Sequence, residues 1–295
     1  MFFHFILGLL ATNLLTPIYG LHCGKLLENQ LYSRNEITAP DEYPWIGRVG
    51  YVTENGTSFP CFSVLIHQRY AILTAFCALS NAEFDESFIL FGNWRENESF
   101  EVRDCRREGN IFQCAAAPQK VDISELVVHP EYKNDIKHNI ALAKLGRDVE
   151  FTDYVQPICL PPVPENDGSH IAQRLEIAGF RRPLWEGQKA DEEGEWRRKV
   201  HVFMASREFC KSVAYPDWQN LSRNHLCALG EEEKTLYFGS PLMGIEVVDE
   251  KPRNFYLVGI PISYMLLNSP KNLTMQIFTR ISPYKKWILK NIAVI

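Results

Sequence analysis

The sequence predicts an all-β protein with a single helix at its C-terminal end, and three observations support this class. The chain has 295 residues, of which 46% are apolar, which is enough for a large core. Its apolar segments are short, rich in Val, Ile, Phe and Tyr, and separated by turn-forming residues. Only the last segment has helical spacing. We therefore expect two sub-barrels within one module rather than two independent domains.

The N-terminal 20 residues are apolar and are followed by polar sequence. This run, MFFHFILGLLATNLLTPIYG, is short for a membrane span and ends in small or turn-forming residues. We interpret residues 1–20 as a secretory signal peptide, with a signal anchor as the alternative. No later stretch is long and apolar enough to cross a bilayer, so we expect a secreted, extracellular protein without a membrane span.

The expected strands follow in order along the chain. Their composition favours β-branched and aromatic residues, and most are shorter than a helix would need. They cover residues 45–52, 62–75, 87–94, 121–128, 139–145, 174–180, 198–205, 255–263 and 276–281. After them, Pro283 stands at a helix start, and Tyr284, Ile288 and Ile292 share one helical face. We expect this helix to pack on the β body.

All eight cysteines follow the proposed cleavage point, which indicates paired disulfides in an exported protein. Zinc is the competing interpretation of a cysteine set. No CxxC pair occurs, and no histidine stands at ligand spacing beside these cysteines, so we expect no metal site and no cofactor.

The formal charge of −5 argues against a nucleic-acid partner, which usually requires a basic face. Acidic clusters at 191–195 and 231–233 are expected to be solvated loops, with a site for a cation or a basic partner as the alternative. Four sequons predict glycosylation of an exported chain, at Asn55, Asn97, Asn220 and Asn272.

Six segments, in order, resemble the chymotrypsin-like (S1 family) serine proteases, most closely the arthropod clip-domain group. They are EYPWIGRVGY, SVLIHQRYAILTAFC, HNIALAKL, VQPICLP, FGSPL and QIFTRISPYKKWI. The resemblance implies two six-stranded antiparallel Greek-key β-barrels with a C-terminal α-helix, over residues 43–295. Residues 21–42 would then be an N-terminal stub tethered by Cys23, too poor in cysteine to be a clip domain.

That family cleaves peptides with a serine nucleophile, a histidine base and an aspartate that orients the histidine. The matching positions here hold Phe238, Phe76 and Asn139. Phenylalanine offers neither a nucleophilic atom nor a titratable proton. Relocated catalysis would have to use Ser240, on a re-aimed loop, with His138 as base. We expect His138 to face away from Asn139, because alternate strand residues point to opposite faces.

Two supporting positions are substituted as well. Leu236 stands where a family glycine precedes the Asp-Ser pair and donates to the oxyanion hole, and Tyr237 stands where an aspartate receives the new N-terminus made by activation cleavage. The activation junction falls on residues 31–35, which lack a basic residue before the expected cut and an isoleucine after it. Arg34 leaves a tryptic cut possible, although such a cut could not start the family's switch.

The resemblance also implies the disulfide pairing, which is Cys23–Cys159, Cys61–Cys77, Cys105–Cys114 and Cys210–Cys227. The pair that normally brackets the nucleophile loop and the specificity pocket is missing on both sides. We therefore expect no primary pocket in protease form.

The resemblance implies a secreted, non-catalytic homologue that acts by binding, as a cofactor, decoy or regulator in an extracellular proteolytic or melanisation-type immune cascade. Its partners would be cascade proteases, prophenoloxidase or inhibitors. The alternatives are a residual or altered serine-type endopeptidase with relocated catalytic groups, and a structural or ligand-carrying secreted module. Phe76 and Phe238 are expected to lie near one another and to fill the former cleft as core, with an exposed aromatic patch as the alternative.

Overall fold

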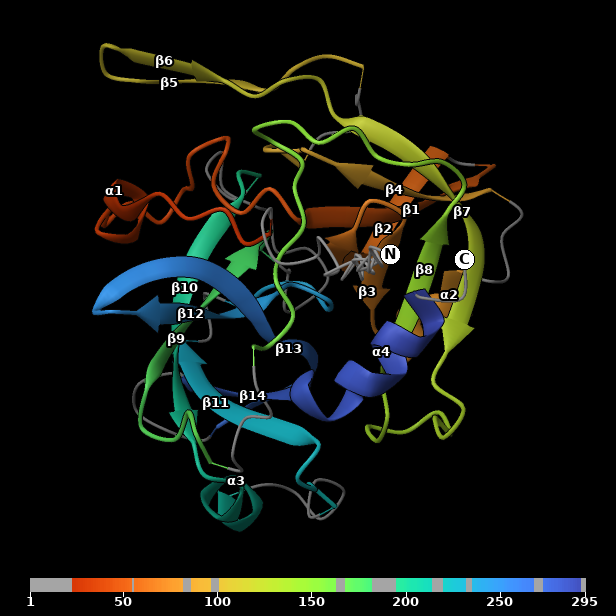
Figure 1. Cartoon of the computed structure of the whole chain (residues 1–295), viewed down its shortest axis with the longest axis vertical. Helices are drawn as coiled ribbons and strands as arrows, with labels where there is room; N and C mark the ends of the chain where they lie inside the picture. Colours follow the sequence, from red (N-terminus) through yellow and green to blue (C-terminus); the bar gives the residue numbers. More distant parts are fainter. Residues whose placement is uncertain are drawn as a thin grey trace, which may run out of the picture.

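Two closed six-stranded antiparallel β-barrels, with a helix at the C-terminal end, form the body of the protein (Figure 1). The expected fold is therefore confirmed. The structure is a computed structural model, and it describes residues 23–54, 56–81, 86–96, 101–162, 168–181, 195–213, 220–231, 235–267 and 273–292. Among these residues, no helix combines the length and the apolar character needed to cross a membrane.

The first barrel has the strand order β1-β2-β3-β8-β7-β4. Its strands are β1 (Ile46–Thr53), β2 (Gly56–His67), β3 (Tyr70–Leu73), β4 (Ser87–Phe91), β7 (Gln119–Val128) and β8 (Ala141–Leu145). The barrel closes where β4 pairs with both β1 and β7. Its core contains fully buried side chains from several strands, including Val49, Val64, Ile72, Ile89 and Leu142.

The second barrel has the strand order β10-β11-β14-β13-β12-β9. Its strands are β9 (Arg174–Gly179), β10 (Arg198–Ala205), β11 (His225–Glu231), β12 (Leu242–Val248), β13 (Lys251–Leu266) and β14 (Leu273–Arg280). Strands β11 and β12 are not among the segments that the sequence predicts as strands. Their apolar runs are short and contain Gly230 and Gly244, which weakens the strand signal. Both segments form strands because they pair with neighbouring strands in the barrel.

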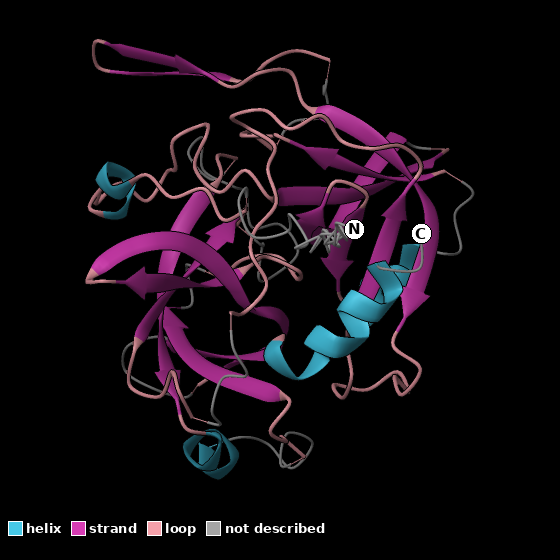
Figure 2. Ribbon diagram, viewed as in Figure 1, coloured by secondary structure: helices cyan, strands magenta, loops and turns pink. Residues whose placement is uncertain are grey.

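Several short elements lie outside the two barrel sheets. The hairpin of β5 (Cys105–Glu108) and β6 (Ile111–Cys114) extends away from both (Figure 1). The helices are α1 (Glu28–Leu31), α2 (Ala75–Asn81), α3 (Arg207–Val213) and α4 (Lys285–Ile292), the last preceded by a 3₁₀ turn at Ser282–Tyr284 (Figure 2). Helix α4 lies where the sequence predicts it, with Ile288 buried in the same apolar cluster as first-barrel residues.

Four disulfides join the eight cysteines, in the pairs that the family resemblance implies: Cys23–Cys159, Cys61–Cys77, Cys105–Cys114 and Cys210–Cys227. Beside the first of them, Gly24 takes a φ of +65°, and a Cβ there would lie 2.1 Å from the carbonyl oxygen of Phe255. Only glycine allows the backbone to approach this closely.

The segment after Cys23 is held by much more than its disulfide. The Thr38 N–H donates to the Arg197 carbonyl at 3.0 Å, and the Lys199 N–H donates to the Glu36 carbonyl at 2.8 Å. The buried Arg197 guanidinium donates to Thr38 Oγ1 and to the Ala39 carbonyl, both at 3.1 Å. Burial lowers the pKa of Arg197 to about 10, so the group stays charged at neutral pH. Residues 36–42 therefore belong to the folded body.

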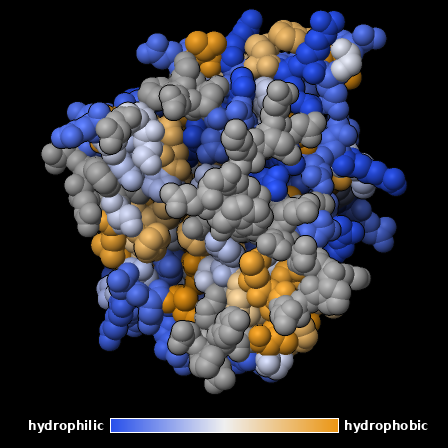
Figure 3. All heavy atoms as spheres, turned by 180° about the vertical axis from the view of Figure 1, so that it is seen from behind, coloured by the Kyte–Doolittle hydropathy of each residue, from blue (hydrophilic) through white to orange (hydrophobic). Residues whose placement is uncertain are grey.

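The surface turned away from the viewer in Figure 1 mixes hydrophilic and apolar residues, with apolar groups gathered mainly in its lower half (Figure 3). Several large apolar side chains are exposed, among them Phe76, Leu79, Phe112 and Phe209.

Candidate binding site at the substituted catalytic positions

Phe76 and Asn139 are held together by a hydrogen bond. Phe76 lies in the first turn of α2, where Thr74 Oγ1 accepts the Cys77 N–H at 3.1 Å and caps the helix. Asn139 is buried just before β8, and its Oδ1 accepts the Phe76 N–H at 3.0 Å. Its carbonyl accepts the Thr279 hydroxyl at 2.9 Å. The positions that correspond to the base and its orienting carboxylate are therefore neighbours, although neither side chain carries a charge.

Phe238 joins the same region through β2. Its carbonyl accepts the Phe62 N–H at 2.9 Å, and its ring centroid lies 6.2 Å from that of Tyr264. Phe62 follows Cys61, which is bonded to Cys77 beside Phe76. The three substituted positions are thus linked around one disulfide.

The expectation that both phenylalanines fill the cleft as core is wrong for Phe76. Its side chain is 48% exposed, whereas Phe238 is partly buried against the core. The reason is the helical repeat, because α2 turns Ala75 and Ala78 into the core and leaves Phe76 and Leu79 on the outside. An aromatic ring is therefore exposed to solvent beside Asn139.

The two supporting positions are filled by apolar and aromatic packing. Leu236 is 4% exposed and belongs to the core of the second barrel. The Tyr237 ring centroid lies 5.3 Å from that of Phe62, and its N–H donates to the Phe180 carbonyl at 3.2 Å. Phe62 in turn stacks on Phe180 at 5.4 Å. Aromatic contacts thus occupy the place where the family makes an ion pair.

The loop geometry keeps Ser240 away from solvent. Gly239 takes a φ of +89°, and a Cβ there would lie 1.9 Å from the Phe62 carbonyl oxygen, so this turn requires glycine. Ser240 is fully buried, and its Oγ has no hydrogen-bond partner in the part of the chain that the structure describes. It packs against Gly179, and a substrate could not reach it.

His138, the other residue considered for relocated catalysis, faces a different group. Its Nε2 lies 3.4 Å from Glu131, and its Nδ1 lies 3.2 Å from the Tyr284 hydroxyl. His129 stacks on it with ring centroids 5.1 Å apart. Burial and the neighbouring His138 lower the pKa of His129.

This histidine and glutamate cluster is absent from the predictions made from the sequence, which considered metal ligands only beside cysteines. The H-x-E spacing of His129 and Glu131, followed by His138 within ten residues, was the available signal.

Some predicted positions lie outside the described residues. These are the signal peptide at 1–20, the sequons at Asn55, Asn97 and Asn272, and most of the two acidic clusters. The fourth sequon, at Asn220, is described and exposed.

Comparisons with known proteins match this chain to the trypsin family. The family profile described as Trypsin matches residues 34–288. Phenoloxidase-activating factor 1 of Holotrichia diomphalia is 28% identical over 281 residues, which cover 92% of this chain and 72% of that protein. CLIP domain-containing serine protease B9 of Anopheles gambiae is 28% identical over 276 residues, with 92% and 65% covered. The chain is thus shorter than either relative.

Solved structures support the same fold. One described as the Drosophila Grass clip serine protease of the Toll pathway matches with a TM-score of 0.73 and 22% sequence identity. The match covers 94% of this chain and 76% of that one. At this identity, the comparison shows the shared fold alone.

Proposed function

This chain belongs to the trypsin family, and from that premise we propose that it is a secreted, non-catalytic member that acts by binding other extracellular proteins. The observation that carries the proposal is the hydrogen bond between Phe76 and Asn139, together with the link from Phe238 through Phe62 to the Cys61–Cys77 disulfide. The scaffold keeps these positions together, while the groups that would perform acyl transfer are absent from them.

The chemistry of peptide cleavage has no route through these side chains. Phe238 cannot form an acyl-enzyme, and Phe76 cannot accept a proton. Asn139 uses its amide oxygen to accept a backbone N–H and carries no charge with which to stabilise an imidazolium. The buried Ser240 hydroxyl offers no replacement nucleophile.

The names of the relatives suggest the setting. They include phenoloxidase-activating factors and CLIP domain-containing serine proteases. We therefore propose a role for this chain in an extracellular proteolytic cascade of the melanisation type, as a cofactor, decoy or regulator. The four disulfides and the apolar leader are consistent with an exported protein.

A capture experiment tests this function. The tagged mature protein, incubated with body fluid of its own organism, should recover a protease, prophenoloxidase or a protease inhibitor, identified by mass spectrometry. Phe76→Ser should weaken that binding by more than about tenfold if the exposed ring is an anchor of the interface.

Phe209→Ser is the matched control. Phe209 is also exposed, at 44% against 48% for Phe76, and each phenylalanine precedes a disulfide-bonded cysteine in a seven-residue helix. The control variant should bind as the unmodified protein does. Consistent recovery of none of the three protein classes would contradict the cascade role.

Cleavage at Arg34 should occur without producing activity. Arg34 and Asn35 are exposed, so a trypsin-like protease can reach the bond between them. The released end would begin with Asn35, and Tyr237 has no carboxylate to receive its amine. Because Cys23–Cys159 holds the short piece, the cut should appear only on a reducing gel.

Arg34→Gln is the control for this cut and should not be cleaved after position 34 under the same protease treatment. Ester hydrolysis, measured before and after cleavage, should not change in either protein. A rise in hydrolysis after cleavage at Arg34 alone would show that an activation switch survives.

A further inference from the structure

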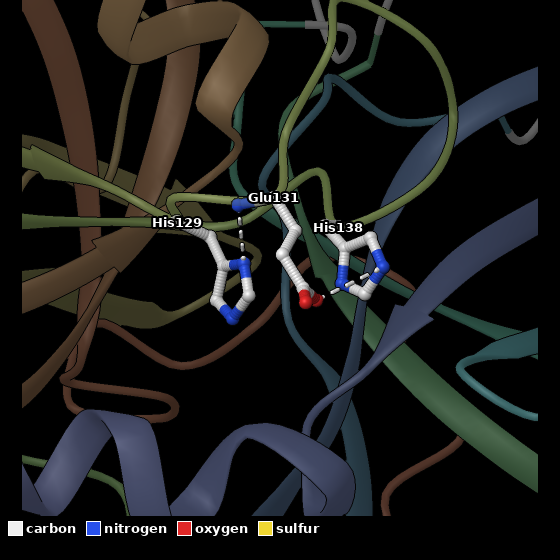
Figure 4. A group of neighbouring side chains, drawn as sticks. All are labelled: His129, Glu131 and His138. Atoms are coloured by element: carbon white, nitrogen blue, oxygen red, sulfur yellow. Dashed lines mark hydrogen bonds and ion pairs between the residues drawn. The ribbon is translucent and has the colours of Figure 1, made fainter.

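A group of side chains that could bind a metal ion lies on the loop between β7 and β8. Figure 4 shows His129, Glu131 and His138 on this loop, with the Glu131 carboxylate directed towards His138. They help to line a surface cavity of about 520 Å³, whose lining also includes Tyr284 and Trp287 of the C-terminal turn and helix.

The three side chains are close enough to share an ion. One possible ligand atom from each lies within 4.8 Å of the others. Ligands at about 2.0–2.1 Å from a tetrahedral zinc ion are themselves about 3.4 Å apart. Each donor therefore has to move by only about 1 Å, within the reach of side-chain rotation. Glu131 is free to make such a move because its side chain is 68% exposed.

The surrounding structure holds His138 in place. Its Nδ1 lies 3.2 Å from the hydroxyl of Tyr284, an arrangement typical of an outer partner that orients a metal-binding histidine. The loop is also tied to β11, because His225 Nε2 lies 3.0 Å from the Ile136 carbonyl. His138 itself takes a φ of +53°, a costly backbone conformation that its surroundings must maintain.

Two features oppose an ion and limit its affinity. His129 Nδ1 accepts the Glu131 N–H at 3.3 Å, and this long hydrogen bond is lost whichever ring nitrogen binds the metal. Arg223 and Arg280 also line the cavity and repel a cation, with only Glu131 to offset them among the lining residues. The ion would have to gain its stability from the donor chemistry rather than from net charge.

We propose that His129, Glu131 and His138 form a binding site for zinc or a chemically similar divalent transition metal. Two imidazoles and one carboxylate suit zinc, whereas calcium and magnesium prefer oxygen ligands throughout. Three protein ligands leave one position for water. The bound ion would join both ends of the β7–β8 loop and stiffen it beside Asn139.

Calorimetric titration of the purified mature protein with Zn²⁺ tests this site, with Ca²⁺ and Mg²⁺ in parallel. We expect one Zn²⁺ per chain and no comparable binding of the other two ions. Co²⁺ should give the visible absorption of a four-coordinate site with nitrogen and oxygen ligands. Zn²⁺ should also raise the melting temperature, because it binds the folded chain.

Variants separate this site from adventitious binding. The double variant His129→Gln/His138→Gln should lose Zn²⁺ binding, and Glu131→Gln should weaken it at least about tenfold. His201→Gln, which removes a histidine from the second barrel, should bind as the unmodified protein does. Glu131→Gln keeps the test valid if the double variant folds poorly. No Zn²⁺ binding by the unmodified protein, or equal binding by Glu131→Gln, would overturn the proposal.

Discussion

The purified protein should hydrolyse peptide and ester substrates about 10⁶-fold more slowly than a trypsin-family enzyme with an intact triad. Loss of all three triad members has an effect of this order on kcat. The physical reason is that Phe238 and Phe76 remove the nucleophile and the base together. A serine-directed fluorophosphonate probe should therefore leave the folded protein unlabelled.

Two variants test whether another residue, or a restored triad, gives hydrolysis. Ser240→Ala should leave any trace hydrolysis unchanged, because the Ser240 hydroxyl is fully buried. The triple variant Phe76→His/Asn139→Asp/Phe238→Ser should stay at least about 10²-fold below an intact enzyme, since Leu236 does not restore the oxyanion-hole geometry. Hydrolysis that disappears in Ser240→Ala would contradict the non-catalytic proposal.

Lys199→Met should lower the free energy of unfolding by about 3–5 kcal/mol, because it leaves the buried carboxylate of Glu42 without its ammonium partner. Lys199 Nζ lies 2.8 Å from Glu42 Oε1, and the two side chains are only 4% and 5% exposed. The same ammonium donates to the Gln30 carbonyl at 2.8 Å. Denaturant unfolding with the disulfides intact would measure the loss.

The control for this variant is Lys144→Met, which breaks a surface pair with Glu125 whose side chains are 34% and 57% exposed. That change should cost less than about 1 kcal/mol. The double variant Glu42→Gln/Lys199→Met should be less destabilised than the sum of its single changes, because neither charge is then left alone. Equal losses in Lys199→Met and Lys144→Met would show that the N-terminal segment does not depend on the buried pair.

The strands illustrate how much of the fold could be predicted. Segments such as 45–52 and 139–145 form strands of the first barrel because their apolar composition already favours that state. Strands β11 and β12 could not be predicted in the same way. Their short runs, broken by glycine, become strands because long-range pairing in the closed barrel satisfies their backbone groups.

The candidate site also has features that could be predicted from the sequence and features that could not. The amino-acid types at positions 76, 139 and 238 are enough to show that Phe76, Asn139 and Phe238 lack the groups of a triad. The exposure of Phe76 and the burial of Ser240 follow from the folded arrangement and could not be read from the residue types.

The metal-binding cluster depends on tertiary structure in the same way. The β7–β8 loop brings His138 back to His129 and Glu131 across several residues. The spacing of these residues in the sequence marks them as candidate ligands but does not specify that return. The chemistry of a side chain is set by its residue type alone. Whether that side chain is exposed, and which other side chains lie near it, depends on how distant strands close into barrels and on where the connecting loops then lie.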